Sequence, residues 1–94
     1  MKFEWDPEKA VENFINHGVT FEESTAVFND FFAIEYLDDR YPETRYQRIG
    51  LAASGILFVV FTMRGDDDEI TRIISARKAT TQEEVDYFKQ SHEK

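Results

Sequence analysis

The segment Ile56–Phe61 (ILFVVF) is apolar at every position, and it constrains the fold more than any other feature of the chain. It is far shorter than the run of about 20 apolar residues that spans a bilayer, and it has the length of a buried strand. A strand that is apolar on both faces needs other elements on both sides of its sheet. We therefore expect a central strand in a sheet that helices cover.

The remaining segments predict a single α+β domain. Four strand-like segments follow one another with short polar turns between them, which favours an antiparallel meander. These segments are 32–37, 45–51, 56–63 and 70–76. Alternation predicts a short N-terminal strand, and capping patterns predict an αα-hairpin and a C-terminal helix. The corresponding segments are 1–5, 7–17, 20–28 and 82–92. The expected fold is a four-stranded antiparallel meander flanked by these elements.

The composition excludes several kinds of chemistry. The chain has no cysteine, so disulfides, thiolate metal sites and a cysteine nucleophile are absent. A reducing cytoplasmic location fits this composition, and the N-terminus lacks the apolar stretch of a signal peptide. No glycine-rich phosphate-binding motif is present, and the two histidines have no partner at metal-ligand spacing. We therefore expect no cofactor and no bound metal.

Charge is unevenly distributed along the chain. The formal net charge is −8, and residues 1–44 carry 3 basic and 11 acidic side chains, whereas residues 45–94 carry 8 of each. Such an acidic protein repels nucleic acid at long range. The basic residues of the second half lie close together in sequence, so that half can still present a positive face.

The segment RIISARKA holds the arginines with the clearest chemical meaning. Strict alternation places Arg72, Ile74 and Ala76 on one face of a strand, and Ser75 and Arg77 on the other. Guanidinium groups bind a phosphodiester with two hydrogen bonds and stabilise charge that develops on phosphorus oxygens during RNA cleavage. The alternative is that these arginines pair with nearby carboxylates.

Two further groups have a functional and a structural interpretation. Arg45 and Arg48 flank Tyr46, a pattern that suits single-stranded RNA, although an exposed strand face with a buried tyrosine has the same pattern. His17 has the titration range of a general acid or base, but it also fits the end of a helix. We assign no role to His92.

Several motifs together resemble the BrnT family of toxins. They are FEWDPEKA at 3–10, N-x-x-x-HGV-x-F-E-E at 13–23, E-x-R-Y-x-x-I-G at 43–50, RIISARKAT at 72–80 and E-x-x-x-Y at 83–87. Their order and spacing cover nearly the whole chain. The resemblance implies one toxin domain over residues 1–94 with a RelE-like α+β fold. It also implies an endoribonuclease of a type II toxin–antitoxin pair that cuts RNA without metal and inhibits translation.

The resemblance also implies partners and most of the site residues; Arg48, Arg64 and Lys78 are added on the chemistry of their charge alone. The partners are an RNA substrate and a BrnA-like antitoxin, and DNA is contacted only through that antitoxin; no membrane is involved. The expected catalytic residues are His17, Glu43, Arg64, Arg72 and Arg77, with His17 or Glu43 as the proton acceptor. The expected RNA-binding residues are Lys9, Arg45, Arg48, Ser75, Lys78 and Tyr87.

Two positions depart from the family pattern. Asn16 stands where we expect lysine, and Met63 stands where we expect glutamate. The second change removes an acid that can act as a general base. A rival interpretation is therefore a degenerate, non-catalytic protein-binding module, whose acidic helical half recruits a basic protein partner. For the toxin, we expect the acidic first half, including Glu22 and Glu23, to contact the antitoxin.

Overall fold

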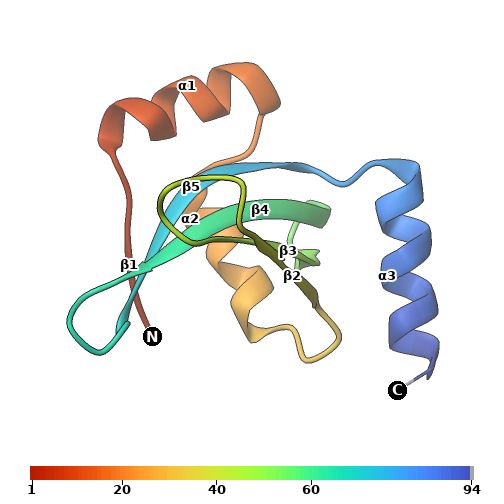
Figure 1. Ribbon diagram of the computed structural model, residues 1–94. Coiled ribbons are helices and arrows are strands. Elements are labelled where there is room, and N and C mark those ends of the chain that lie inside the picture. Colours follow the sequence, from red (N-terminus) through yellow and green to blue (C-terminus); the bar gives the residue numbers. More distant parts are fainter. Residues whose placement is uncertain (94) are drawn as a thin grey trace.

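A computed structural model describes residues 1–93, and the side chains of residues 1–90. Its centre is a five-stranded sheet with the strand order β1-β5-β4-β3-β2 (Figure 1). The strands are β1 (Lys2–Glu4), β2 (Ile34–Asp38), β3 (Arg45–Ala52), β4 (Gly55–Arg64) and β5 (Ile70–Lys78). β4 contains the apolar run and is the middle strand, as the sequence predicts.

The sheet differs from the expected meander at one edge. Strands β2 to β5 are antiparallel to their neighbours, but β1 pairs in parallel with β5, with Lys2 opposite Ile70 and Glu4 opposite Arg72. The sheet is therefore mixed and five-stranded, and the expectation of a four-stranded antiparallel, RelE-like sheet is inexact. The sequence pattern of β1 defines a strand, but it carries no information about a partner almost 70 residues away.

The N-terminal helices cover one face of the sheet. They are α1 (Pro7–His17), α2 (Phe21–Ser24) and the 3₁₀ helix η1 (Thr25–Asn29). The Asp6 side chain accepts a hydrogen bond from the Glu8 N–H at 2.9 Å, and Gly18 ends α1 with a φ of 70°. The expected second helix is divided into α2 and η1. The Ser24 and Thr25 hydroxyls donate to carbonyls three residues earlier, which competes with the regular helical pattern.

Two apolar clusters hold the layers together. The larger lies under the N-terminal helices and joins Val19, Phe21 and Val27 to side chains of β4 and β5, including Leu57 and Val59. The contact between η1 and β3 is very close, since a Cβ on Gly50 would lie 2.9 Å from the Val27 Cβ. A glycine is therefore required at this crossing.

The smaller cluster lies on the other face, under α3 (Thr81–Glu93). Ile49 and Ile56 from the sheet contact Tyr87 from the helix, with Phe58 at their edge. Figure 1 shows α3 at one end of the sheet, away from α1. The side chain of His92, for which we expected no role, lies outside the described residues.

Beyond the end of β1, a side chain instead of a strand forms hydrogen bonds with the edge of β5. The buried Asn13 amide donates to the Ala76 carbonyl at 2.8 Å and to the Val19 carbonyl at 3.0 Å. Its Oδ1 accepts from the Ala76 N–H at 3.1 Å. Asn13 thus satisfies the backbone of β5 as a neighbouring strand would, and it fixes α1 to the sheet.

Tyr87 and Asp30 connect α3 to the rest of the domain. The Tyr87 hydroxyl donates to Asp30 Oδ2 at 2.6 Å, and the Leu51 N–H donates to the same oxygen at 2.8 Å. Burial alone would raise the pKa of Asp30, but the hydrogen bonds from Tyr87, Leu51 and Phe32 and the charge of Arg48 hold it below its usual value. Burial and the bond to Asp30 raise the pKa of Tyr87 to about 12.

We expect Asn13→Ala to lower the free energy of unfolding by about 3 kcal/mol, because the substitution leaves three buried backbone groups without their partner. Asn16→Ala, at an exposed side chain of the same helix, is the matched control and should change stability by less than about 0.5 kcal/mol. Urea unfolding of both variants tests this expectation. Equal stabilities of the two variants would contradict it.

We expect Tyr87→Phe to cost about 2 kcal/mol at pH 7, because it removes a hydrogen bond to a charged group. The folded pKa of Tyr87 lies above its ordinary 10.0, so this stabilisation is complete below pH 10 and is lost between pH 10 and about 12. The folded pKa of Asp30 lies below its ordinary 3.8, so the stabilisation is also lost as the pH falls below that value. Urea unfolding at several pH values should show that the variant and the wild type differ less in free energy of unfolding at both pH extremes. Tyr36→Phe, at an exposed tyrosine, should show no such pattern.

Candidate nucleic-acid interface

A β-bulge decides which side chains of β5 share a face. Val60 of β4 lies opposite Ser75, whereas the next residue, Phe61, lies opposite Ile73. Ile74 is therefore an extra residue, and it resets the alternation along β5. As a result, Arg72 lies on the same face as Ser75 and Arg77. The prediction from strict alternation, which put Arg72 on the opposite face, is wrong for this reason.

The register across the sheet extends this face over all five strands. Arg72 lies opposite both Thr62 and Glu4, and Arg45 lies opposite Asp38. The N-terminal helices pack on the other side, and α3 covers only the end near Ile56. We call the uncovered surface the open face. Its residues are Lys2, Glu4, Tyr36, Asp38, Arg45, Gln47, Val60, Thr62, Arg64, Arg72, Ser75 and Arg77. Asp38 and Thr62 point to this side of the sheet but are buried by their neighbours.

Every predicted arginine on the open face has a carboxylate partner. Arg72 pairs with Glu4, and Arg77 pairs with Glu83 at 2.8 Å. The alternative weighed from the sequence, pairing with acids, therefore applies to both arginines of the RIISARKA segment. The open face combines guanidinium donors with carboxylates and has no large excess of positive charge.

Glu43 lies between two arginines at the end of the sheet. Its Oε1 is 3.3 Å from Arg45 Nε, and its Oε2 is 3.1 Å from Arg64 Nη2. These two ion pairs share one carboxylate, so Arg45, Glu43 and Arg64 together carry a net charge of +1. The Arg45 guanidinium also lies over the Tyr41 ring, 3.9 Å from its centroid.

A pocket of about 390 Å³ opens beside Glu43. Its lining includes Arg64, Tyr46, Thr62 and Met63. The Thr62 hydroxyl donates to the Thr44 carbonyl and closes one wall of the pocket. The pocket thus brings a carboxylate and a guanidinium next to a space that a nucleotide group can enter. Met63, where the family pattern has an acid, faces the same space.

Arg77 also has a structural role. Its two terminal nitrogens donate to both carboxylate oxygens of Glu83, and its guanidinium lies 4.1 Å from the centroid of the Phe58 ring. Hydrogen bonds from Arg77 hold the pKa of Glu83 below its usual value, although burial acts in the opposite direction. Because Glu83 also accepts from the Thr80 N–H, this pair fixes the beginning of α3 to β5.

Arg48 and Tyr46 do not lie on the open face. The Arg48 Nε donates to the Val27 carbonyl at 2.9 Å, and its Nη1 pairs with Glu35 at 3.0 Å on the helix side of the sheet. Tyr46 stacks on Phe61 on that same side. The expected RNA-binding pair of Arg45 and Arg48 is therefore separated, because residues three apart in a strand point to opposite faces.

Three other predicted residues lie away from the open face. His17 is exposed at the end of α1, and within residues 1–90 no hydrogen bond or ion pair links it to the arginines. Lys78 donates to the Ser54 carbonyl at 2.9 Å. Tyr87 is buried against Asp30. Lys78 and Tyr87 thus each make a structural contact within the domain, and the RNA-binding role expected for them stays a prediction.

Lys9 lies next to the open face although it belongs to α1. It pairs with Glu12 at 3.7 Å, and together with Asp6 and Arg72 it lines a pocket of about 170 Å³ at the edge of β5. The two predicted cations, Lys9 and Arg72, are thus neighbours around one small hollow.

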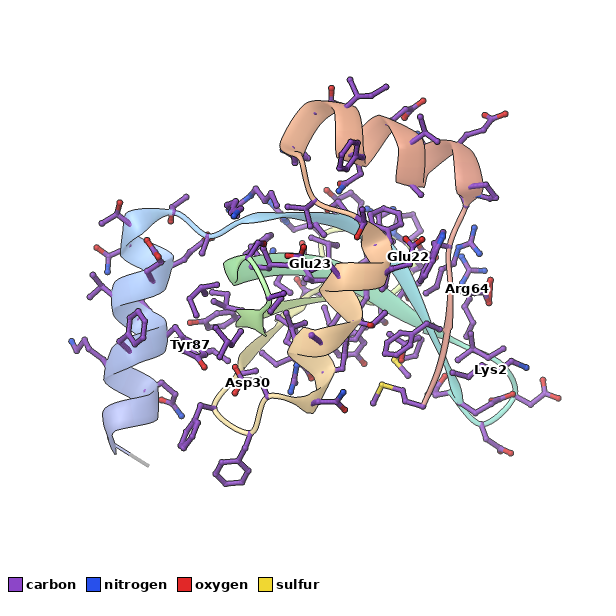
Figure 2. All side chains as sticks on the ribbon, turned by 180° about the vertical axis from the view of Figure 1, so that it is seen from behind. Lys2, Glu22, Glu23, Asp30, Arg64 and Tyr87 are labelled. Carbon is purple, nitrogen blue, oxygen red and sulfur yellow. The ribbon has the colours of Figure 1, made fainter. Side chains whose placement is uncertain are left out.

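Sequence reasoning missed Lys2 and Gln47. Lys2 and Arg64 both lie opposite Ile70, and Figure 2 shows them at the same end of the sheet. Gln47 donates to Asp38 at 3.1 Å on the open face. The alternation of Lys2 with Phe3 was visible in the sequence, but only the parallel pairing of β1 reveals which face Lys2 shares.

The described residues contain no cluster of three histidine, cysteine or acidic side chains arranged to hold a metal ion. None of the helices in this part of the chain is long and apolar enough to cross a membrane.

Comparisons with known proteins agree with the sequence resemblance. A family model described as the ribonuclease toxin BrnT of type II toxin–antitoxin systems matches residues 5–83. The crystal structure of the Brucella abortus ribonuclease toxin BrnT aligns with a TM-score of 0.65 and 26% identity, covering 86% of this chain and 99% of that one. No curated protein matches the chain. Since the family model spans most of the sequence, the chain belongs to the BrnT family of ribonuclease toxins.

Proposed function

We propose that this chain is an endoribonuclease that needs no metal, inhibits translation by cutting RNA, and is neutralised by a BrnA-like antitoxin through which alone it contacts DNA. Membership of the BrnT family supports the role of a ribonuclease toxin. The observation that carries the finer proposal is the presence of Arg45, Arg64, Arg72 and Arg77 on one open face of the sheet.

The proposed reaction is attack of a ribose 2′-hydroxyl on the adjacent phosphorus. Glu43 takes the proton of that hydroxyl, and the bond to the 5′ oxygen breaks, leaving a 2′,3′-cyclic phosphate. The departing 5′ oxygen takes a proton from water. Arg45 and Arg64, on either side of Glu43, stabilise the negative charge that grows on the non-bridging oxygens. His17, the other proton acceptor that the sequence suggests, is left out because it lies outside this face.

The other polar groups of the open face suit a single strand. Arg72 and Lys9 line one hollow and can hold the next phosphate. Tyr36, Gln47 and Ser75 lie in a row between the arginines and offer stacking and neutral hydrogen bonds to bases. This arrangement favours unpaired RNA, whose bases are accessible, over a duplex.

The carboxylate partners lower the affinity for RNA without blocking it. An exposed ion pair stabilises a protein by only about 0–1 kcal/mol, so a phosphodiester that accepts two hydrogen bonds can compete with Glu4 for Arg72. The net charge of −8 gives no attraction at long range, so binding depends on these local contacts.

The same pairing favours a second candidate function, a protein-binding module without catalysis. All four arginines have acidic partners, and Met63 lines the Glu43 pocket in place of an acid. Expression in cells separates the two functions, because an active toxin inhibits growth without its partner and a binding module does not.

We expect Glu43→Gln and Arg64→Ala each to slow cleavage of a single-stranded RNA about 100-fold, because each removes a group that acts in the transition state. Lys89→Ala, on the exposed surface of α3, is the control for a lost positive charge and should cleave at the wild-type rate. Cleavage by the wild type should persist in EDTA. Wild-type rates in both site variants, with an intact circular dichroism spectrum, would overturn the mechanism.

We expect Glu4→Gln to tighten RNA binding about fivefold, equivalent to about 1 kcal/mol, because it frees Arg72 from a competing carboxylate. Glu84→Gln, which changes the net charge equally on α3, is the control. Fluorescence anisotropy of a labelled single-stranded RNA measures both affinities. The same affinity for the two variants would show that Glu4 does not compete with RNA.

A further inference from the structure

Helix α1 exposes its largest apolar side chains to solvent. The exposed fractions are 60% for Val11, 52% for Phe14 and 75% for Ile15. These positions lie on one helical face, because their spacing is three and four residues. Asn13 and the small Ala10 occupy the side that faces the sheet. The stripe therefore contributes little to the fold, and a patch of this kind marks an interaction surface.

The stripe forms one wall of a groove. A hollow of about 280 Å³ lies between α1 and the beginning of α2, where Phe21 forms the floor and Glu22 the opposite wall. Figure 2 shows Glu22 at the beginning of α2, beneath α1. The groove is separate from the open face, because these helices pack on the other side of the sheet.

Acidic side chains border the groove on both sides. Glu8 and Glu12 precede Val11 and Ile15 by three positions, so each lies next to the apolar stripe on α1. Glu22 provides an acid on the other wall. An apolar groove between acidic walls complements a segment that is apolar on one side and basic on the other.

We propose that the groove between α1 and α2 binds a basic amphipathic helix of a partner protein. Apolar residues of that helix pack against Val11, Phe14 and Ile15, and its lysines or arginines pair with Glu8 and Glu22. α1 has 11 residues and is about 16 Å long, which matches three turns of a partner helix. The partner's identity as the antitoxin rests on the proposed function, whereas the assignment of the surface does not require RNA cleavage.

Charge argues against two other occupants of the groove. A second copy of this chain also carries a net charge of −8 and would bring a second set of acidic walls to the same place. A membrane surface with anionic lipids is repelled by Glu8 and Glu22 for the same reason.

Trp5 provides a built-in reporter of this groove. It is the only tryptophan of the chain, and its ring lies 5.9 Å from the Phe21 ring, centroid to centroid. The probe is a synthetic 14-residue peptide with leucines at helical spacing and lysines at the other positions. A peptide with the same leucines and glutamates in place of the lysines is its matched control. We expect the lysine peptide alone to change Trp5 fluorescence in a saturable way.

Ile15→Glu should weaken binding of the lysine peptide about tenfold or more, because it places a charge in the apolar stripe. Leu51→Glu, at a side chain that is 52% exposed on β3, is the control and should bind as the wild type does. Glu22→Lys should reverse the preference toward the glutamate peptide. Ile15 and Glu22 are both exposed, so circular dichroism of the two groove variants should confirm an intact fold.

Four results would overturn the proposal. The first two are equal binding of the lysine peptide by Ile15→Glu and wild type, and equal binding of the two peptides by wild type. The other two are a concentration-dependent dimer in sedimentation that Ile15→Glu abolishes, and anionic vesicles that change Trp5 fluorescence as strongly as the lysine peptide does. RNA cleavage by Ile15→Glu is measured in parallel and should equal that of the wild type. A wild-type chain that binds the peptide but cleaves no RNA would disprove the proposed nuclease and support the groove.

Discussion

The apolar strand β4 requires cover on both of its faces, and the structure meets this requirement unequally. The N-terminal helices cover one face along most of the strand, whereas α3 covers only Ile56 and Phe58 on the other. Beyond Val60 the second face becomes polar, with Thr62 and Arg64. The chain thus uses one half of this face for stability and leaves the other half uncovered by helices, where we propose that RNA binds. The position of the open face follows directly from where the apolar run of β4 ends.

Each arginine of the open face is oriented by an acid, which has two consequences. The ion pairs restrict the guanidinium groups, so in the proposed function less conformational entropy would be lost when a phosphate binds them. RNA would have to displace these acids or share the guanidinium groups with them, which would lower its affinity. Arg77 is the least free of the four arginines, because its contacts with Glu83 and Phe58 also hold α3 in place. The four arginines therefore differ in how free they are to bind a ligand.

Local patterns allowed accurate prediction of the elements that depend on nearby residues. Asp6 and Thr20 cap α1 and α2, and the apolar run forms the central strand, because these features act within a few residues. The family resemblance is confirmed by the family model. The sequence alone did not reveal which side chains of β5 share a face, because the bulge at Ile74 arises from the pairing between two strands. The acid partners of the arginines could not be predicted from local sequence either. Glu4 is 68 residues from Arg72, and nothing in its local sequence indicates that contact.

The amide of Asn13 has a consequence for solubility. An unpaired strand edge is a template on which other chains can add strands and start to aggregate. β1 covers the first residues of β5, and Asn13 occupies the backbone groups of Ala76 further along, so this side of the sheet offers no continuous row of free donors and acceptors. The opposite side ends in β2, a strand of only five residues. A domain of this small size is thereby protected from edge-to-edge growth by one well-placed side chain and one short strand.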